Sequence, residues 1–173
     1  MIRHECLESL AAKMSDQLVV TSQSGQRIEW SHLSKHEGNL LVGMMGCAIG
    51  VATGLALALP HRKVIALDSD GSVLLSLFNL ATLGNLQPKN LVIYVFDNGV
   101  YSGSRISYPT ATSGNADLEA MARYHTHHHH PVGDVLKREL KGYADDLKTV
   151  SVFKPSTDTA KFAEKIYVDV FGV

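Results

Sequence analysis

The chain has 173 residues, a formal net charge of −1 at pH 7 and 45% hydrophobic residues. We expect one domain with its own core, spanning residues 1–173, because this length leaves no room for a second domain. The near-zero charge excludes a strongly basic nucleic-acid-binding protein. Cys6 and Cys47 fit no metal or redox spacing, and the N-terminus lacks the apolar run of a signal peptide, so we expect a reduced, cytoplasmic setting.

The N-terminal part of the chain contains one predicted helix and one predicted strand. Apolar residues recur at helical spacing over residues 2–14, with Leu7, Leu10, Ala11 and Met14 on the inner side. Residues 17–21 form a short apolar run that predicts a strand. Residues 22–34 are polar and contain glycine, so we expect a loop there.

Residues 38–60 carry no charge and are long enough to cross a bilayer. Gly46, Gly50 and Gly54 also have the spacing of a membrane dimerisation face. We favour a soluble loop and helix, because Gly43 and Gly46 break the segment and a predicted strand begins three residues after Pro60. In a soluble fold, these glycines allow a buried helix to lie close to a strand or subunit.

The middle of the chain predicts a βαβ unit. Residues 63–67 and 91–96 are apolar and rich in β-branched residues, as in parallel strands that are buried on both faces. Residues 72–86 predict one crossover helix, with Asp70 or Ser72 as its N-cap. Its predicted inner residues are Leu75, Phe78, Leu80, Leu83 and Leu86.

Polar residues follow both predicted strands, where a parallel sheet collects its ligands. Asp70-Gly71-Ser72 comes after the first strand, and Asp97-Asn98-Gly99 comes after the second. The Asp70 carboxylate and the Asn98 amide oxygen are ligands that Mg²⁺ accepts, and amide groups at the start of a helix bind phosphate. Each residue taken alone could simply cap a helix or form a turn, but together they predict a site for a diphosphate carried on a divalent cation.

The residues after Tyr101 predict a mobile loop over residues 102–114, which would order over a substrate. Arg105 could bind a second anionic group of that substrate or could be a solvated surface residue. We interpret the histidine-rich run at residues 125–130 as an exposed loop with incidental metal affinity. The other predicted elements are helices at residues 117–124, 131–147 and 157–171 and a strand at residues 149–153.

Ser69-Asp70-Gly71-Ser72, followed by Asp97-Asn98, resembles the Gly-Asp-Gly-Ser to Asn-Asn signature of thiamine-diphosphate-dependent enzymes. Other stretches are similar to the phosphonopyruvate and sulfopyruvate decarboxylase group, including the sulfopyruvate decarboxylase beta subunit. The likeness covers about residues 36–123, and the stretches are Gly43-Met44-Met45-Gly46, residues 57–64, residues 87–92 and Asp97-Asn-Gly-Val-Tyr101. The resemblance implies an α/β fold in three layers, doubly wound, with helices on both faces of a mostly parallel sheet.

The resemblance also implies roles for individual residues. Asp70, Asn98 and the Val100 carbonyl would bind Mg²⁺, and Gly71 and Ser72 would bind the diphosphate. The Gly43 carbonyl would contact the aminopyrimidine, Met45 would hold the cofactor in a bent shape, and Tyr101 would complete the cofactor site; without the resemblance, Met45 reads as an ordinary core residue.

Two positions depart from the family signature. Ser69 replaces its first glycine, which calls into question whether the backbone tolerates a β-carbon there. Asp97 replaces the first asparagine, which is not the metal ligand of the family.

The resemblance implies a thiamine-diphosphate- and Mg²⁺-dependent lyase that decarboxylates a 2-oxoacid. The chain would supply only the diphosphate-binding half, so we expect a separate pyrimidine-binding, alpha-type subunit and a dimer or higher oligomer through the cofactor site. The alternatives are an acetolactate-synthase-like carboligase, a 2-oxoacid oxidoreductase and a cofactor-binding subunit without turnover. The proton-relay glutamate of pyruvate-decarboxylase-like enzymes has no counterpart after Tyr101.

Overall fold

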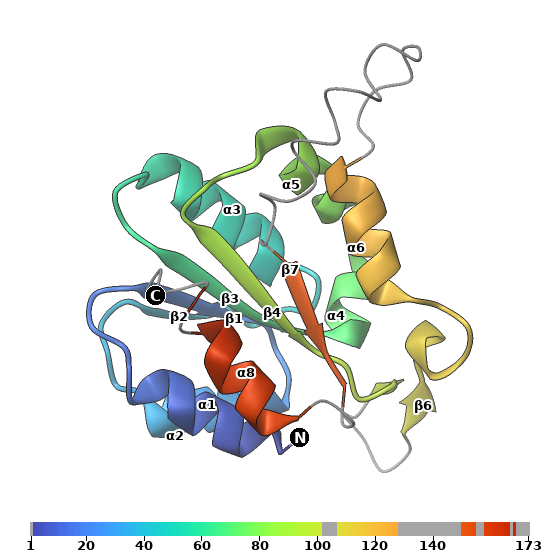
Figure 1. The fold of residues 1–173 in the computed structure, drawn as a ribbon, viewed down its shortest axis with the longest axis horizontal. Helices are drawn as coiled ribbons and strands as arrows, with labels where there is room; N and C mark the ends of the chain where they lie inside the picture. The colour runs from blue at the N-terminus through green and yellow to red at the C-terminus, as the bar shows by residue number, and fades with distance from the viewer. Residues whose placement is uncertain (1, 102–106, 128–149, 155–157, 167, 169–173) are drawn as a thin grey trace.

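A five-stranded sheet forms the centre of the molecule, and every neighbouring pair of its strands is parallel (Figure 1). The structure is a computed structural model that describes residues 2–101, 107–127, 150–154, 158–166 and 168. The strand order is β2-β1-β3-β4-β7, with bounds Asn39–Leu41, Leu18–Thr21, Val64–Ser69, Leu91–Phe96 and Val150–Phe153. This order places the carboxyl ends of β1, β3 and β4 side by side at one edge.

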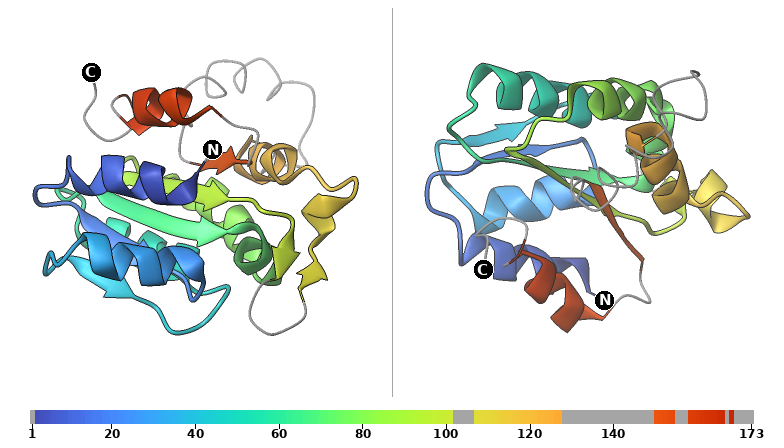
Figure 2. Two further views of the ribbon diagram at one scale, coloured as in Figure 1. Left: turned by 90° about the horizontal axis from the view of Figure 1, so that it is seen from below. Right: turned by 45° about the horizontal axis from the view of Figure 1, so that its top comes forward.

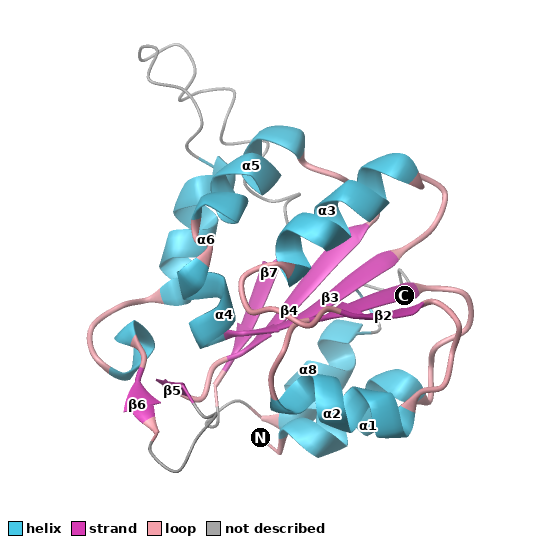
Figure 3. Ribbon diagram, turned by 180° about the vertical axis from the view of Figure 1, so that it is seen from behind, coloured by secondary structure: helices cyan, strands magenta, loops and turns pink. Residues whose placement is uncertain are grey.

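Helices cover both faces of the sheet, which confirms the predicted α/β architecture (Figures 2 and 3). One face is covered by α1 (Arg3–Ala11), α2 (Gly25–Leu33) and α8 (Thr159–Ile166). The other face is covered by α3 (Ala48–Ala58), α4 (Asp70–Leu75), α5 (Phe78–Leu86) and α6 (Leu118–His127).

Side chains alternate between two cores along the central strands. In β3, Val64 and Ala66 pack under α3, whereas Ile65 and Leu67 pack against the α1, α2 and α8 face. All four are fully buried, as expected for a strand covered on both sides. The apolar runs that predicted these strands are therefore explained by burial on both faces.

The prediction of a loop over residues 22–34 is wrong, because residues 25–33 form α2. Trp30 explains why this polar stretch is helical. Its ring is fully buried in the core, and its Nε1 donates a hydrogen bond to Asn39 Oδ1 at 2.9 Å. A weak local helix preference is thus outweighed by the burial of one large side chain.

The prediction of a single helix over residues 72–86 is also wrong, because the helix is interrupted at Ser76 and Leu77, between α4 and α5. Ser69, rather than Asp70 or Ser72, occupies the N-cap position of α4. Leu80 and Leu83 are buried as expected, but Leu75, Phe78 and Leu86 are 60%, 70% and 43% exposed. The break rotates these three apolar side chains away from the sheet.

The region after β4 contains structure that the sequence did not indicate. A short antiparallel pair joins β5 (Val100–Tyr101) to β6 (Tyr108–Pro109), and a 3₁₀ helix follows at Ala111–Ser113. The predicted loop over residues 102–114 is therefore wrong for residues 108–113. The predicted helix over residues 131–147 and most of the histidine run lie outside the described residues, but α6 extends to His127, so the start of that run is helical.

The uncharged stretch at residues 38–60 folds as β2, a turn and α3. Since α3 has only 11 residues, it is too short to cross a bilayer. Across the described part of the chain, no helix combines the length and apolar character that a membrane span needs.

Candidate functional site

Three aspartates are buried at the carboxyl ends of β3 and β4. Asp68 and Asp70 are 1% and 0% exposed, and Asp97, directly after β4, is 5% exposed. Burying carboxylates costs free energy unless hydrogen bonds or a cation compensate. The surroundings of these side chains therefore indicate what the site holds.

Asp70 has one satisfied oxygen and one unsatisfied oxygen. The Thr110 hydroxyl donates to Asp70 Oδ2 at 2.6 Å, and Thr112 Oγ1 lies 3.2 Å from the same oxygen. Asp70 Oδ1 is buried and has no hydrogen-bond partner. A buried carboxylate oxygen without a donor fits a metal ligand, because a hard cation would satisfy its charge.

Asp97 is linked to the same cluster through Thr112. The Thr112 hydroxyl lies 2.7 Å from Asp97 Oδ1, which also accepts the Gly99 N–H at 3.0 Å. A hydroxyl carries a single hydrogen, so the two shortest contacts identify the pairings: Thr110 donates to Asp70, and Thr112 donates to Asp97. Two neighbouring threonines thus fix the orientation of both carboxylates.

Asn98 lies at the mouth of the site, on the turn that leads into β5. Its Oδ1 accepts the Val100 N–H at 3.1 Å, which holds the amide oxygen in place. Gly99 has φ +73°, a conformation that favours glycine, so the turn requires this residue. The Tyr101 ring then packs on Gly71, where an added β-carbon would lie 2.5 Å from Tyr101 Cε1.

The Gly43–Gly46 turn is anchored to the start of α4 and to α5. The Gly46 N–H donates to Ser72 Oγ at 2.8 Å, and Asn79 Nδ2 donates to the Gly46 carbonyl at 3.2 Å. Gly46 has φ +78°, so a β-carbon would strain this turn. The two bonds hold the peptide that places Met45 at the site. The Ser72 hydroxyl therefore supports the turn, which leaves the backbone of Ser72 for any contact with a diphosphate.

A cavity of about 290 Å³ opens between these elements. Five of the predicted site residues line it: Met45, Gly71, Asn98, Val100 and Tyr101. Asp70 and Ser72, both fully buried, lie behind its wall, and Gly43 faces open space. Arg105 lies outside the described residues. The fold thus brings together most of the residues that the sequence motif singled out.

The opposite wall of the cavity comes from residues that sequence reasoning missed. Residues 23–26 comprise the end of the β1–α2 connection and the first two residues of α2, and Arg3 reaches the cavity from the start of α1. The signal was present: a Ser-Gly-containing stretch directly follows a predicted strand, whose carboxyl end belongs at the same sheet edge. Interpreting residues 22–34 as a loop concealed that this stretch begins a helix.

The electrostatics of the site favour a cation with few protein ligands. Burial raises the pKa of Asp68, and the neighbouring Asp70 charge raises it further. Within the described ranges, no three His, Cys, Asp or Glu side chains converge as a metal cage. Mg²⁺ suits such a site, since it commonly binds one or two carboxylates and keeps several waters or phosphate oxygens.

Ser69 causes no backbone strain in place of the signature glycine. Its φ of −122° and ψ of 158° are ordinary extended values that any residue adopts. The helix that follows is short, with six residues in α4, so its dipole contributes less to phosphate binding than the sequence suggested.

Comparisons with known proteins identify the family and the fold. Residues 22–166 match the family model described as thiamine pyrophosphate enzyme, C-terminal TPP binding domain. A crystal structure of benzoylformate decarboxylase from Polynucleobacter necessarius shares the fold, with a TM-score of 0.58 and 18% identity over 87% of this chain and 32% of that chain.

Two curated relatives are more similar in sequence. Sulfopyruvate decarboxylase subunit beta of Methanocaldococcus jannaschii is 32% identical over 123 residues, which are 70% of this chain and 64% of that protein. Phosphonopyruvate decarboxylase of Streptomyces viridochromogenes is 38% identical over 122 residues, which are 69% of this chain and 30% of that protein. The match thus spans less than two thirds of each relative. The chain belongs to the thiamine pyrophosphate enzymes, in the family of their C-terminal TPP-binding domains.

Proposed function

We propose that this chain is the diphosphate-binding subunit of a non-oxidative, thiamine-diphosphate-dependent 2-oxoacid decarboxylase. The observation that carries the proposal is Asp70: a fully buried carboxylate with one oxygen held by Thr110 and the other without a partner. Asp70 begins α4 directly before Gly71, and Thr112 links it to Asp97, which precedes Asn98; a Mg²⁺ ion and a diphosphate bound there would satisfy its charge. The chain would act as a single module over residues 1–173.

Different residues at the cavity would bind the metal ion, the diphosphate and the pyrimidine ring. Asp70, Asn98 and the Val100 carbonyl would hold Mg²⁺. Gly71 and the Ser72 backbone would bind the diphosphate, with the Tyr101 ring packed beside them. Met45 would keep the cofactor bent, and the Gly43 carbonyl would accept a hydrogen bond from the aminopyrimidine.

Bound thiamine diphosphate supplies the carbon nucleophile that adds to the keto group and the electron sink that makes loss of CO₂ possible. The chain's own residues orient the cofactor and exclude water. Ser72 and Asn79 hold the two peptide groups that flank the Gly46 Cα, so the neighbouring Met45 stays against the cavity. The two threonines keep the carboxylates oriented before the metal binds, which lowers the cost of assembling the site.

We propose that the substrate is an anionic 3-substituted pyruvate of the sulfopyruvate or phosphonopyruvate type. The support is that relatives at 32% and 38% identity are named sulfopyruvate decarboxylase subunit beta and phosphonopyruvate decarboxylase. Ser69, which fits the backbone without strain, removes the main reason to prefer a subunit that has lost cofactor binding.

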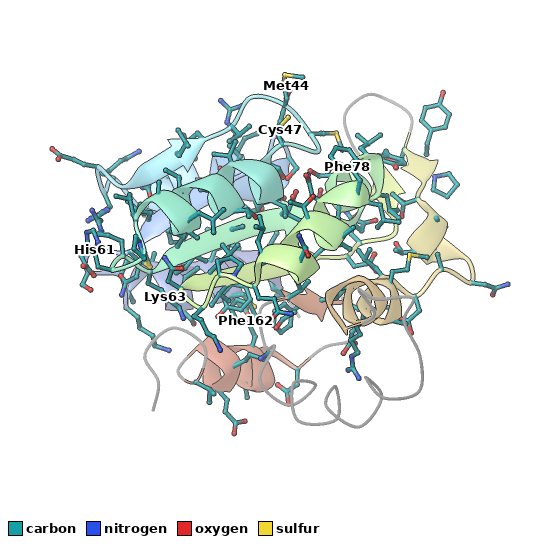
Figure 4. The ribbon with its side chains drawn as sticks, turned by 90° about the horizontal axis from the view of Figure 1, so that it is seen from above. Met44, Cys47, His61, Lys63, Phe78 and Phe162 are labelled. Carbon is teal, nitrogen blue, oxygen red and sulfur yellow. The ribbon has the colours of Figure 1, made fainter. Side chains whose placement is uncertain are left out.

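We further propose that a pyrimidine-binding subunit docks beside the Gly43 turn. Met44, Leu75 and Phe78 are 66%, 60% and 70% exposed there, although all three are large and apolar. Figure 4 shows Met44, Cys47 and Phe78 along one edge of the molecule. A β-carbon on Gly43 would meet no atom within 4 Å, so the turn leaves room beside this residue for a partner chain.

Calorimetric titration of thiamine diphosphate with Mg²⁺ tests the cofactor site. We expect wild type to bind and Asp70→Ala to lose binding while it remains folded; equal binding by both proteins would contradict the proposal. A screen of 2-oxoacids with the chain co-expressed with a candidate pyrimidine-binding subunit then tests activity and substrate. Full turnover by the isolated chain would disprove the need for a partner.

A further inference from the structure

The wall of the cavity opposite the aspartates carries a positive charge. Among the described residues that line the cavity, Arg3 is the only one with a charged side chain. Arg3 is the first residue of α1, and α1 runs antiparallel to β1, so its N-terminus lies at the same sheet edge as the carboxyl ends of the strands. The topology therefore places this cation at the site.

Glu29 of α2 holds the Arg3 guanidinium in a fixed orientation. Arg3 Nε and Nη2 donate to the two Glu29 carboxylate oxygens at 3.1 Å and 2.6 Å. An arginine has five N–H donors, and this two-pronged pairing uses the donors along one edge of the guanidinium. The Nη1 side of Arg3 remains for a second anion.

The guanidinium lies directly over the start of α2. A β-carbon on Gly25 would lie 2.4 Å from Arg3 Nη2 and 3.3 Å from Arg3 Nη1, so only glycine allows this approach. The N-cap residue Ser24 makes no side-chain capping hydrogen bond. The Ser24 hydroxyl lines the cavity, is buried and has no partner, so it can donate to an anion. This end of α2 therefore presents an unused hydroxyl beside a fixed cation.

A diphosphate beside Asp70 also needs donors other than the metal, and Arg3 can supply N–H donors although Glu29 offsets its charge. A diphosphate and the Asp70 carboxylate together carry more negative charge than one divalent ion neutralises. A guanidinium binds phosphate oxygens in a planar, two-pronged geometry, and it retains its charge under all physiological conditions.

We propose that Arg3 is a cofactor-binding residue that contacts the terminal phosphate of thiamine diphosphate, with Glu29 as its positioning residue. The inference rests on the proposed function. It assigns to α1 a part in the site in addition to its packing role, and it makes binding depend on the second phosphate of the cofactor.

Titration of the full chain with thiamine diphosphate and with thiamine monophosphate, both with Mg²⁺, tests the inference. We expect Arg3→Gln to weaken thiamine diphosphate binding by about tenfold or more, because a hydrogen bond to a charged group is lost. Binding of the monophosphate should change little, so the preference for the diphosphate should shrink. Arg3→Lys should fall between wild type and Arg3→Gln, since it keeps the charge but loses the fork.

Two control variants separate contact with phosphate from structural support. Glu29→Gln keeps the Arg3 guanidinium but removes the charge that orients it, so it should weaken thiamine diphosphate binding less than Arg3→Gln does, and part of the diphosphate preference should remain. Arg27→Gln removes a positive charge from α2, the helix of Glu29, at a position that does not line the cavity, and it should leave binding unchanged.

The outcomes distinguish the inference from the proposed function. If wild type binds the cofactor and Arg3→Gln binds it equally well, the inference is overturned and the function stands. The inference is also overturned if Glu29→Gln loses the preference as fully as Arg3→Gln does, because Arg3 would then act only by holding the two helices together. If wild type shows no cofactor binding, the proposed function itself fails.

Discussion

Two regions of the central sheet bury very different side chains. On the face under α8, the rings of Tyr94, Phe96, Phe153 and Phe162 pack together, with centroid separations from 4.7 to 6.4 Å. At the carboxyl edge, Asp70 and Asp97 are buried almost as completely, yet each has an oxygen without a partner. The aromatic cluster stabilises the fold by packing. The aspartate edge costs stability, and in the proposed function a cation would offset this cost.

The largest effect on stability should come from the aromatic cluster. Phe162, which Figure 4 labels, is fully buried, and its ring meets the Phe153 ring edge-on, with an interplanar angle of 76°. Phe162→Ala should lower the free energy of unfolding by ~3–5 kcal/mol, because it removes a large buried side chain and leaves a cavity. Urea unfolding measures this loss.

Phe78→Ala is the matched control, since Phe78 is 70% exposed. It should change the free energy of unfolding by no more than about 0.5 kcal/mol. It should weaken association with the pyrimidine-binding subunit instead. Equal destabilisation by the two variants would contradict the distinction between core and docking residues.

A substitution at the aspartate edge should lower cofactor affinity without lowering the stability of the fold. Asp70→Asn should reduce the affinity for thiamine diphosphate and Mg²⁺ by about a hundredfold or more, since even residues that support metal ligands contribute 10–100-fold. Its free energy of unfolding should stay equal or rise, because a buried charge is removed while the bond from Thr110 can persist. Titration and unfolding of one protein preparation compare the two effects, and a large loss of stability would disprove the contrast.

A smaller loss of Mg²⁺ affinity should follow when Asp70 is kept but loses the hydrogen bond that orients it. Thr110→Val keeps the shape of the side chain but removes the hydroxyl that donates to Asp70 Oδ2. The affinity for Mg²⁺ should fall by about tenfold, the lower end of the range for residues that orient metal ligands. Thr110→Ser should restore binding; if it does not, the methyl group rather than the hydrogen bond matters.

The last effect appears only at alkaline pH, on the aromatic side of the sheet. Burial raises the pKa of the Cys6 thiol from 9.0 to about 11. Between these values the unfolded chain has already lost the proton that the folded chain retains, so stability should fall as pH rises from 9 to 11. The free energy of unfolding of Cys6→Ala should fall less steeply over this range, which urea unfolding at several pH values measures. Parallel slopes would show that Cys6 titrates alike in both states.

The aspartate motif was predictable because each of its parts is local. Asp70-Gly71-Ser72 and Asp97-Asn98 each follow an apolar strand, and parallel strands bring such ends together. The threonine pair was not predictable. Thr110 lies forty residues from Asp70 and has no signature of its own, so only the folded chain shows that it donates to that carboxylate.

The helix errors have a related cause. Leucine spacing over residues 72–86 indicated an inner face, but hydrophobic residues at helical spacing do not reveal whether they meet the chain's own core or another surface. The error over residues 22–34 has the opposite reason: a polar stretch became helical because one tryptophan, Trp30, is buried against β1 and β3.

The sequence by itself determined the parallel strands, the metal and phosphate motif and the family, because these depend on residue type and short spacing along the chain. Only the tertiary structure decided where the predicted single helix is interrupted and which apolar side chains stay exposed. It also decided that Arg3 lines the cavity and that Thr110 donates a hydrogen bond to Asp70. These features come from contacts between segments that are far apart in sequence. Such contacts stabilise the fold, but they produce no regular spacing of residue types by which the sequence could reveal them.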